Sequence, residues 1–329
     1  MNIKKILLII LGLAIVIGSI ILITNTVNKK EENNNIKYKV VTSNFASYDF
    51  LRAIIGDNSE IELKYLLGPG KDAHSYEPTA NDLITIQNSN LFVYVGGEME
   101  KWSDKVINSL NTSNTEIICI SDFVDKMEEK EVDGAEEDED EHEHEEESHE
   151  HEEGAFDEHI WTSPSNAIKM INALETAIEK IDSQNSNKYK ENANKYIEEI
   201  KKVDNKIQNI VNTKVRDRLV FSDKMPMQYF IDYYNLNVTA AFDGCSTEID
   251  PSAKTIAYLQ NKVKEENIPV ILYIELNPGT VAKTIAEETG AKAMQIQTLH
   301  NVSLNDFKNN ETWVSLMTRN ISVLEAALK

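Results

Sequence analysis

One stretch of the 329-residue sequence decides the fold: residues 187–211 read NKYKENANKYIEEIKKVDNKIQNIV. Apolar and aromatic side chains recur in it at three- and four-residue steps, the spacing of one helix face. These residues are Tyr189, Ala193, Tyr196, Ile200, Val203, Ile207 and Ile210. A helix over this stretch would be roughly 38 Å long, about as long as a domain is wide. We therefore expect a connecting helix, within residues 187–214, that joins two parts of the molecule.

Short runs rich in Val, Ile and Leu alternate with helical patterns on both sides of this stretch. Strands are expected at 38–43, 61–67, 91–95 and 116–120 before it, and at 219–221, 237–241, 270–275 and 292–296 after it. Helices are expected between them, including one that starts at Ser163 and Pro164 with a hydroxyl cap. This alternation is the pattern of a parallel sheet covered by helices. The sequence predicts an α/β protein of two lobes, residues 37–186 and 215–329.

The amino terminus predicts export. Residues 6–24 carry no charge and would span roughly 28 Å as a helix, about the thickness of a bilayer core. A cleaved signal peptide usually has a shorter apolar region of about 7–15 residues. We therefore favour a signal-anchor over a cleaved signal peptide for residues 1–27, followed by a polar tether at 28–36. The rest is expected at the extracytoplasmic face of the membrane, or secreted after cleavage.

The net charge of −22 comes mostly from one segment. Residues 136–153 contain 13 acidic residues, four histidines and one serine. The other 311 residues carry 33 basic against 42 acidic side chains, a net charge of −9. The acidic excess argues against a nucleic-acid partner, which needs a basic surface. We expect a disordered insert at 128–155, because so charged a run cannot pack.

Three histidines lie outside the acidic tract: His74, His159 and His300. Each is placed in a predicted loop between a strand and a helix. In open α/β sheets, the loops at the carboxyl ends of strands form the ligand crevice. Three imidazoles with one carboxylate suit zinc, whereas an oxygen-rich site suits manganese. The candidate carboxylates are Asp223 and, second, Glu275, although Asp223 could instead cap a turn and Glu275 could be a plain charge at a strand end.

Five motifs resemble one family. Residues 71–79 (KDAHSYEPT) resemble the D-x-H-x-Y-E-P-T signature of the zinc/manganese solute-binding proteins of ABC transporters, the ZnuA/TroA-like family. The other four, which also resemble motifs of that family, are 157–167 (DEHIWTSPSNA), 221–230 (FSDKMPMQYF), 244–248 (GCSTE) and 300–302 (HNV). The resemblance covers about residues 37–329.

The resemblance implies a monomeric, non-enzymatic protein with a rigid connecting helix and a metal site in the cleft between its lobes. It implies capture of Zn²⁺ and delivery to an ABC transporter permease in the membrane. His74 and His159 match N-terminal-lobe ligands of the family, and His300 matches a C-terminal-lobe ligand position. The sequence departs from the family at Lys224, where many zinc members carry His and manganese members Glu, so the fourth ligand falls to Asp223 or Glu275.

Other functions stay open at this point. A manganese-specific solute-binding protein or adhesin is one alternative, with Mn²⁺ as the ion. A zinc metallohydrolase is another, because catalytic zinc also uses three protein ligands and an open position. The sequence has no His-Glu-x-x-His motif. The tract histidines are expected to capture metal weakly, or else to be incidental to a solvated linker; they are His142, His144, His149 and His151.

Overall fold

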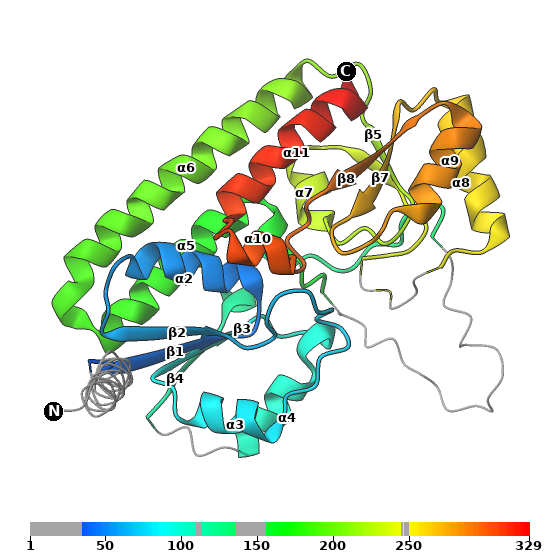
Figure 1. Ribbon diagram of the computed structural model, residues 1–329. Coiled ribbons are helices and arrows are strands. Elements are labelled where there is room, and N and C mark those ends of the chain that lie inside the picture. Colours follow the sequence, from blue (N-terminus) through cyan, green and yellow to red (C-terminus); the bar gives the residue numbers. More distant parts are fainter. Residues whose placement is uncertain (1–34, 110–113, 136–155, 245, 247–249) are drawn as a thin grey trace, which may run out of the picture.

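The computed structural model describes residues 35–109, 114–135, 156–244, 246 and 250–329. In these residues the chain forms two sheets of four strands each, and every strand pair is parallel (Figure 1). The N-terminal sheet has the order β2–β1–β3–β4, and its strands are β1 (Tyr38–Thr42), β2 (Ile61–Tyr65), β3 (Leu91–Tyr94) and β4 (Glu116–Cys119). The C-terminal sheet has the order β6–β5–β7–β8, and its strands are β5 (Arg218–Phe221), β6 (Asn237–Thr239), β7 (Val270–Ile274) and β8 (Lys292–Ile296). The predicted two-lobed α/β class is confirmed.

Ten α-helices lie in the described residues. They are α2 (Phe45–Ile55), α3 (Ala80–Gln87), α4 (Trp102–Ser109), α5 (Pro164–Ile181), α6 (Ser186–Asn212), α7 (Gln228–Tyr233), α8 (Ala253–Glu265), α9 (Thr280–Thr289), α10 (Leu304–Lys308) and α11 (Trp313–Leu328). The helix predicted over 187–211 is α6, and its 27 residues make it about 40 Å long. Ser163 and Pro164 start α5 as predicted, but the Ser163 side chain makes no capping hydrogen bond.

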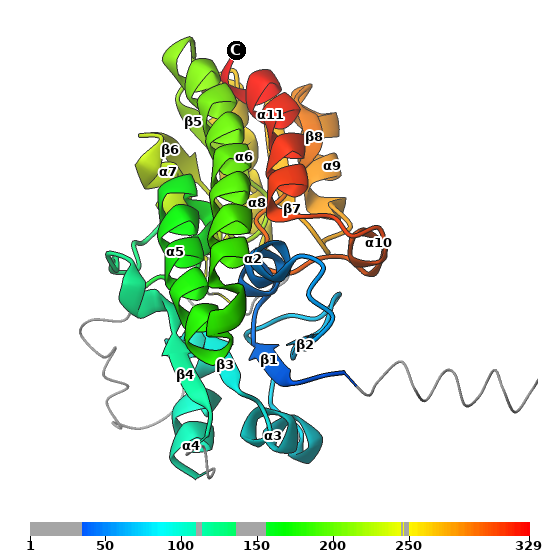
Figure 2. The same ribbon diagram turned by 90° about the vertical axis from the view of Figure 1, so that its left-hand side faces the viewer.

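A layer of helices joins the two sheets. The helix α6 runs along both lobes, α11 packs beside it on the C-terminal lobe, and α5 and α2 pack beside it on the N-terminal lobe (Figure 2). Their apolar side chains form one continuous core with the inner faces of both sheets, from Val40 and Phe50 through Tyr196 to Phe221 and Trp313. The outer faces have separate, smaller cores, under α3 and α4 in one lobe and under α8 and α9 in the other.

Asp49 links three helices of this layer. Its fully buried carboxylate on α2 accepts a hydrogen bond from the Tyr196 hydroxyl of α6. It also accepts the Trp313 backbone N–H at the start of α11 (2.7 Å) and pairs with Arg52 (2.6 Å). A buried charge is tolerated only when it is paired and hydrogen-bonded, so this carboxylate fixes how the three helices meet.

The predicted start of the disordered insert, residue 128, is too early in the sequence. Residues 128–135 pack on the C-terminal lobe, where Asp133 pairs in parallel with Thr239 and accepts the Ala240 N–H through its carbonyl (3.1 Å). The Asp133 carboxylate also contacts Arg218 (3.3 Å) and Lys262 (3.1 Å). This part of the prediction was wrong, because the bonds that Asp133 makes outweigh the polar composition. The acidic tract itself lies outside the described residues.

Among the described residues, no helix is long and apolar enough to cross a membrane. The segment predicted to be a signal-anchor, residues 1–27, lies outside them, as does most of the predicted tether.

Candidate metal centre

The three histidines come from loops that meet between the lobes. His74 lies between β2 and α3, His159 lies directly before the 3₁₀ turn Ile160–Thr162 that precedes α5, and His300 lies between β8 and α10. The N-terminal lobe thus supplies two imidazoles and the C-terminal lobe one. These are the loop positions expected from the sequence, and they agree with the rule that ligand sites form at the carboxyl ends of parallel strands.

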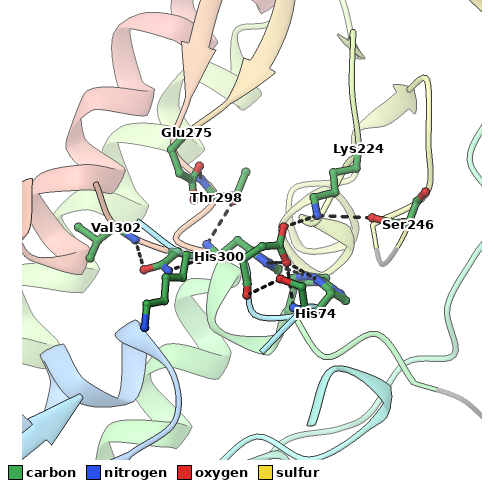
Figure 3. Close-up of polar contacts among 12 residues, drawn as sticks. His74, Lys224, Ser246, Glu275, Thr298, His300 and Val302 are labelled. Carbon is green, nitrogen blue, oxygen red and sulfur yellow. Dashed lines mark hydrogen bonds and ion pairs between the residues drawn. The ribbon is translucent and has the colours of Figure 1, made fainter. Parts of the chain in front are cut away.

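The three imidazole rings form one buried cluster. Figure 3 shows two of its members, His74 and His300, close together. The His300 ring stacks on His74, with ring centroids 4.9 Å apart, and lies 5.2 Å from His159. The His74 and His159 centroids are 5.7 Å apart. The side chains are at most 8% exposed to solvent. Histidine is mostly found at least partly exposed, so three buried together indicate a shared role.

Hydrogen bonds between the lobes hold the loops of His74 and His300 together. The Gly70 N–H donates to the Val302 carbonyl (2.8 Å), and the Asn301 side-chain amide donates to the Lys71 carbonyl. The Tyr65 hydroxyl donates to Asn301 Oδ1 (2.9 Å). Gly70 has φ +77°, in the left-handed region that glycine adopts without steric cost. These contacts place His300 next to His74 although the two are far apart in sequence.

Asp157 orients His159. Its Oδ1 accepts the His159 backbone N–H (2.7 Å) and lies 3.1 Å from the ring Nδ1. A carboxylate at Nδ1 fixes the tautomer with the proton on Nδ1, which leaves Nε2 as an acceptor. His159 Nε2 lies 3.1 Å from His300 Nδ1. His300 therefore donates from Nδ1, and its Nε2 carries a lone pair.

Several acceptor atoms face one another beside His300. Neither His74 ring nitrogen, nor His300 Nε2, has a hydrogen-bond partner among the described residues. Asp72 Oδ1 lies 3.4 Å from His74 Nδ1 and 3.5 Å from His300 Nε2. Buried polar atoms are almost always hydrogen-bonded, so these atoms require another partner. Zinc–nitrogen bonds of about 2.0–2.1 Å place tetrahedral ligands about 3.3–3.4 Å apart, which is close to these separations.

One group of potential ligands converges here: the ligand atoms of Asp72, His74 and His300 all lie within 4.8 Å of one another. His159 is outside that group in the described structure, although its Nε2 contacts the other nitrogen of His300. A single imidazole binds an ion through one nitrogen, so binding by all three histidines requires either the His300 ring to turn, or its proton to move to Nε2 and His74 to approach its Nδ1.

The charges around the cluster are set by burial and by Lys224. Burial lowers the pKa of His300 to about 3, so this imidazole is neutral and can bind a metal ion. Burial alone would raise the pKa of Asp72, but the close His300 and His74 side chains, together with the charge of Lys224, bring it below its ordinary value. Asp72 is therefore a carboxylate. Neutral imidazole beside a carboxylate is a donor set that a zinc ion accepts.

The two carboxyl groups predicted from the sequence have different surroundings. Asp223 is buried, accepts the Ile274 N–H through Oδ2 (3.2 Å), and has no partner at Oδ1 among the described residues. Burial and the charge of Glu275 raise the pKa of Asp223 to about 7. Glu275 accepts the N–H and hydroxyl of Thr298, both at 2.8 Å. Asp223 has a free oxygen for an ion, whereas Glu275 positions the loop that carries His300.

A cavity of about 460 Å³ adjoins the cluster, and Asp72, His74, Asp223, Lys224 and Glu275 are among the residues lining it. The structure thus brings every predicted site residue outside the acidic tract to one place. His159 and His300 do not line the cavity, but their rings are next to that of His74. Sequence reasoning missed Asp72 as a possible ligand and Asp157 as the residue that orients His159. Both stand two positions before a predicted histidine, which was the available signal.

The fold and this donor set define a class: a two-lobed solute-binding protein that takes a transition-metal ion between its lobes. Comparison with known proteins gives the family. The model of the family "Zinc-uptake complex component A periplasmic" (ZnuA) matches residues 40–327. The chain belongs to this family, and it is a zinc-uptake solute-binding protein rather than an enzyme. The metallohydrolase alternative is therefore wrong.

Individual relatives agree with this assignment. The chain is 30% identical over 292 residues to the high-affinity zinc uptake system protein ZnuA of Bacillus subtilis, covering 89% of this chain and 88% of that protein. It is 28% identical to the zinc-binding protein AdcA of Streptococcus pyogenes, covering 88% of this chain and 55% of AdcA. The crystal structure of the Zn(II)-bound ZnuA-like domain of Streptococcus pneumoniae AdcA superposes with a TM-score of 0.71 at 25% identity, covering 89% of this chain and 99% of that domain.

Proposed function

We propose that this protein captures Zn²⁺ outside the cytoplasm and delivers it to the permease of an ABC transporter. His74, His159 and His300 bind the ion, and a carboxylate from the wall of the cavity completes its shell. The observation that carries the proposal is the set of buried imidazole nitrogens without hydrogen-bond partners among the described residues. Imidazole ligands favour zinc over manganese, which prefers oxygen.

The family and its relatives support the delivery step, because the matching family model describes a component of a zinc-uptake complex. A carrier needs a site that can open from one side. The loop that carries His300 allows such opening, because it belongs to the C-terminal lobe, whereas His74 and His159 belong to the N-terminal lobe. Asp72 and Asp223 are the two candidate carboxylates for the fourth position. The tract histidines His142, His144, His149 and His151 would add weak, additional capture before the ion reaches this site.

Replacing one imidazole tests the site. His159→Ala should weaken zinc binding by more than the roughly 10–100-fold that changes to an outer-shell partner cost. Zinc affinity is measured by competition with a chromogenic chelator, and folding of the metal-free protein by circular dichroism. His149→Ala removes an imidazole from the acidic tract and is the matched control, expected to leave the tight event unchanged. Wild-type affinity in a folded His159→Ala protein would show that the ligand assignment is wrong.

A further inference from the structure

We propose that Lys224 is a built-in competitor of zinc: its ammonium group holds Asp72 when the metal is absent, and Asp72 becomes the carboxylate ligand when zinc binds. The inference rests on the proposed function and concerns how the same site binds and releases its ion. It goes beyond the sequence comparison, in which Lys224 is only a departure from the family pattern.

Lys224 and Asp72 form an ion pair between the lobes. Lys224 follows β5 of the C-terminal lobe, and Asp72 lies in the N-terminal-lobe loop that carries His74. Lys224 Nζ lies 3.0 Å from Asp72 Oδ2 and 3.4 Å from the Ser246 carbonyl, contacts that are drawn in Figure 3. The Lys224 side chain is only 12% exposed. An ammonium group so far removed from water needs acceptors nearby, and Asp72 is the charged one.

The backbone holds Lys224 in this position. Lys224 forms a parallel bridge with Phe242, and the carbonyl of Asp223 accepts the N–H groups of Ala241 (3.2 Å) and Phe242 (3.4 Å). The start of the Lys224 side chain is therefore fixed beside the cluster, rather than free to leave it.

The two oxygens of the Asp72 carboxylate contact different groups: one contacts the ammonium of Lys224, and the other contacts the imidazoles. Oδ2 faces Lys224, and Oδ1 faces His74 Nδ1 and His300 Nε2 at 3.4 and 3.5 Å. Those two nitrogens have no hydrogen-bond partner among the described residues. Oδ1 is thus already at ligand spacing from two imidazole nitrogens, while a cation balances the charge at Oδ2. A zinc ion that binds Oδ1 shares the carboxylate with Lys224 and is repelled by its charge.

Such a competitor suits a carrier. When zinc leaves, Asp72 keeps a cationic partner and is not left as an unpaired charge, so the metal-free site is stabilised relative to the loaded one. Zinc affinity is lowered and release is faster than the same ligands would give without Lys224. The other titratable groups lining the cavity besides His74 and Asp72 are acidic, and as carboxylates they attract zinc, whereas Lys224 repels it. They are Asp223, Glu275 and Asp250.

The test replaces the charge of Lys224 and measures both affinity and release. Lys224→Met removes the charge and keeps an unbranched side chain that is only one atom shorter, and it should tighten zinc binding about tenfold, the equivalent of about 1.4 kcal/mol. The dissociation rate, measured by mixing the zinc-loaded protein with excess chelator in a stopped-flow instrument, should fall by a similar factor. Lys224→Arg keeps the charge and should stay within about threefold of the wild type. Lys283→Met removes the same charge from an exposed site on α9 and is the matched control.

The double change identifies Asp72 as the partner. Asp72→Asn should weaken zinc binding, and in that background Lys224→Met should no longer tighten it, because the two act through one contact. Weaker or unchanged binding by a folded Lys224→Met protein overturns the inference, as does wild-type affinity in Asp72→Asn. If the methionine variant does not fold, Lys224→Gln replaces it. The His159→Ala result separates the two proposals: if that variant loses zinc while Lys224→Met behaves as wild type, only this inference fails.

Discussion

At the scale of single residues, the main feature of the site is, among the described residues, a set of hydrogen-bond acceptor atoms that face one another with no donor between them. Asp157 holds the proton of His159 on Nδ1, His159 accepts from His300, and the lone pair left on His300 Nε2 faces the carboxylate of Asp72. The hydrogen bond from His159 to Asp157 determines the other two contacts, because it fixes the tautomer of His159, and the acceptor nitrogen of His159 then fixes the tautomer of His300. The chain of bonds thus prepares the donor atoms for a cation before one arrives.

The buried state of His300 has a consequence for stability. Its pKa is about 3 in the folded protein, against about 6.5 for an unperturbed histidine. The unfolded chain therefore takes up a proton below about pH 6.5 that the folded protein does not. This proton uptake favours the unfolded state, so the folded protein loses stability as the pH falls from about 6.5 towards 3, at about 1.4 kcal/mol per pH unit, whereas above pH 6.5 neither state is protonated and nothing is lost.

We expect His300→Gln to remove this contribution. Urea unfolding of the metal-free proteins at pH 7, 6 and 5, with a chelator present, should show the wild type losing about 1.4 kcal/mol more than the variant between pH 6 and 5. Parallel pH profiles for the two proteins would mean that His300 takes up its proton equally well in the folded state.

The sequence predicted His74, His159 and His300 because each lies in a predicted loop between a strand and a helix, and such loops meet at one edge of a parallel sheet. It could not rank the carboxylates. Asp72 reaches the site only because the loop at Gly70 is bonded to the loop at Val302, a contact between distant segments. Glu275, favoured second from the sequence, accepts two hydrogen bonds from Thr298 instead. Which oxygen stays free depends on tertiary contacts that periodicity does not record.

At the scale of elements, all eight strands lie where alternation and β-branched residues placed them, mostly within two residues at each end. The element that was not predicted from the sequence and that matters most is α11. Its buried residues recur at three- and four-residue steps from Trp313 to Leu328, so the pattern of one helix face was present in the sequence and was overlooked. The stretch at 128–135 shows the reverse error, because a polar sequence can still pack when its backbone extends a sheet edge, as Asp133 does beside Thr239.

The described residues on the two sides of the acidic tract are bonded to each other, which makes a deletion informative. Glu128 and Phe156 form an antiparallel bridge, and the Asp157 N–H donates to the Met127 carbonyl (3.0 Å). Replacing residues 136–153 with a short Gly-Ser linker should therefore leave His159 in place. Calorimetry should show the tight zinc event unchanged and only weaker events lost. Loss of the tight event, in a protein with wild-type thermal stability, would mean that the tract contributes ligands to the primary site.

At the scale of the whole molecule, the lobes share structure rather than meeting at a hinge. One continuous core runs from the N-terminal sheet through α2, α5, α6 and α11 to the C-terminal sheet. The long helix α6 crosses the junction, and bending it would break backbone hydrogen bonds. The helix α11 packs along it and contacts α2 at its first residue, Trp313. Trp313 adds a bond across the junction, because its indole N–H donates to the Trp161 carbonyl (2.9 Å).

Zinc binding should therefore change the molecule locally. Small-angle scattering of the metal-free and zinc-loaded protein should give radii of gyration within about 0.5 Å of each other, on a value of roughly 19 Å for a folded body of this size. Hydrogen exchange should instead show new protection confined to the loops around His74 and His300, because one of these two rings has to move for one ion to reach all three imidazoles. A change in radius well above about 1 Å would require α6 and α11 to bend or separate. In that case the lobes would close as rigid bodies, and the prediction of a local change would be wrong.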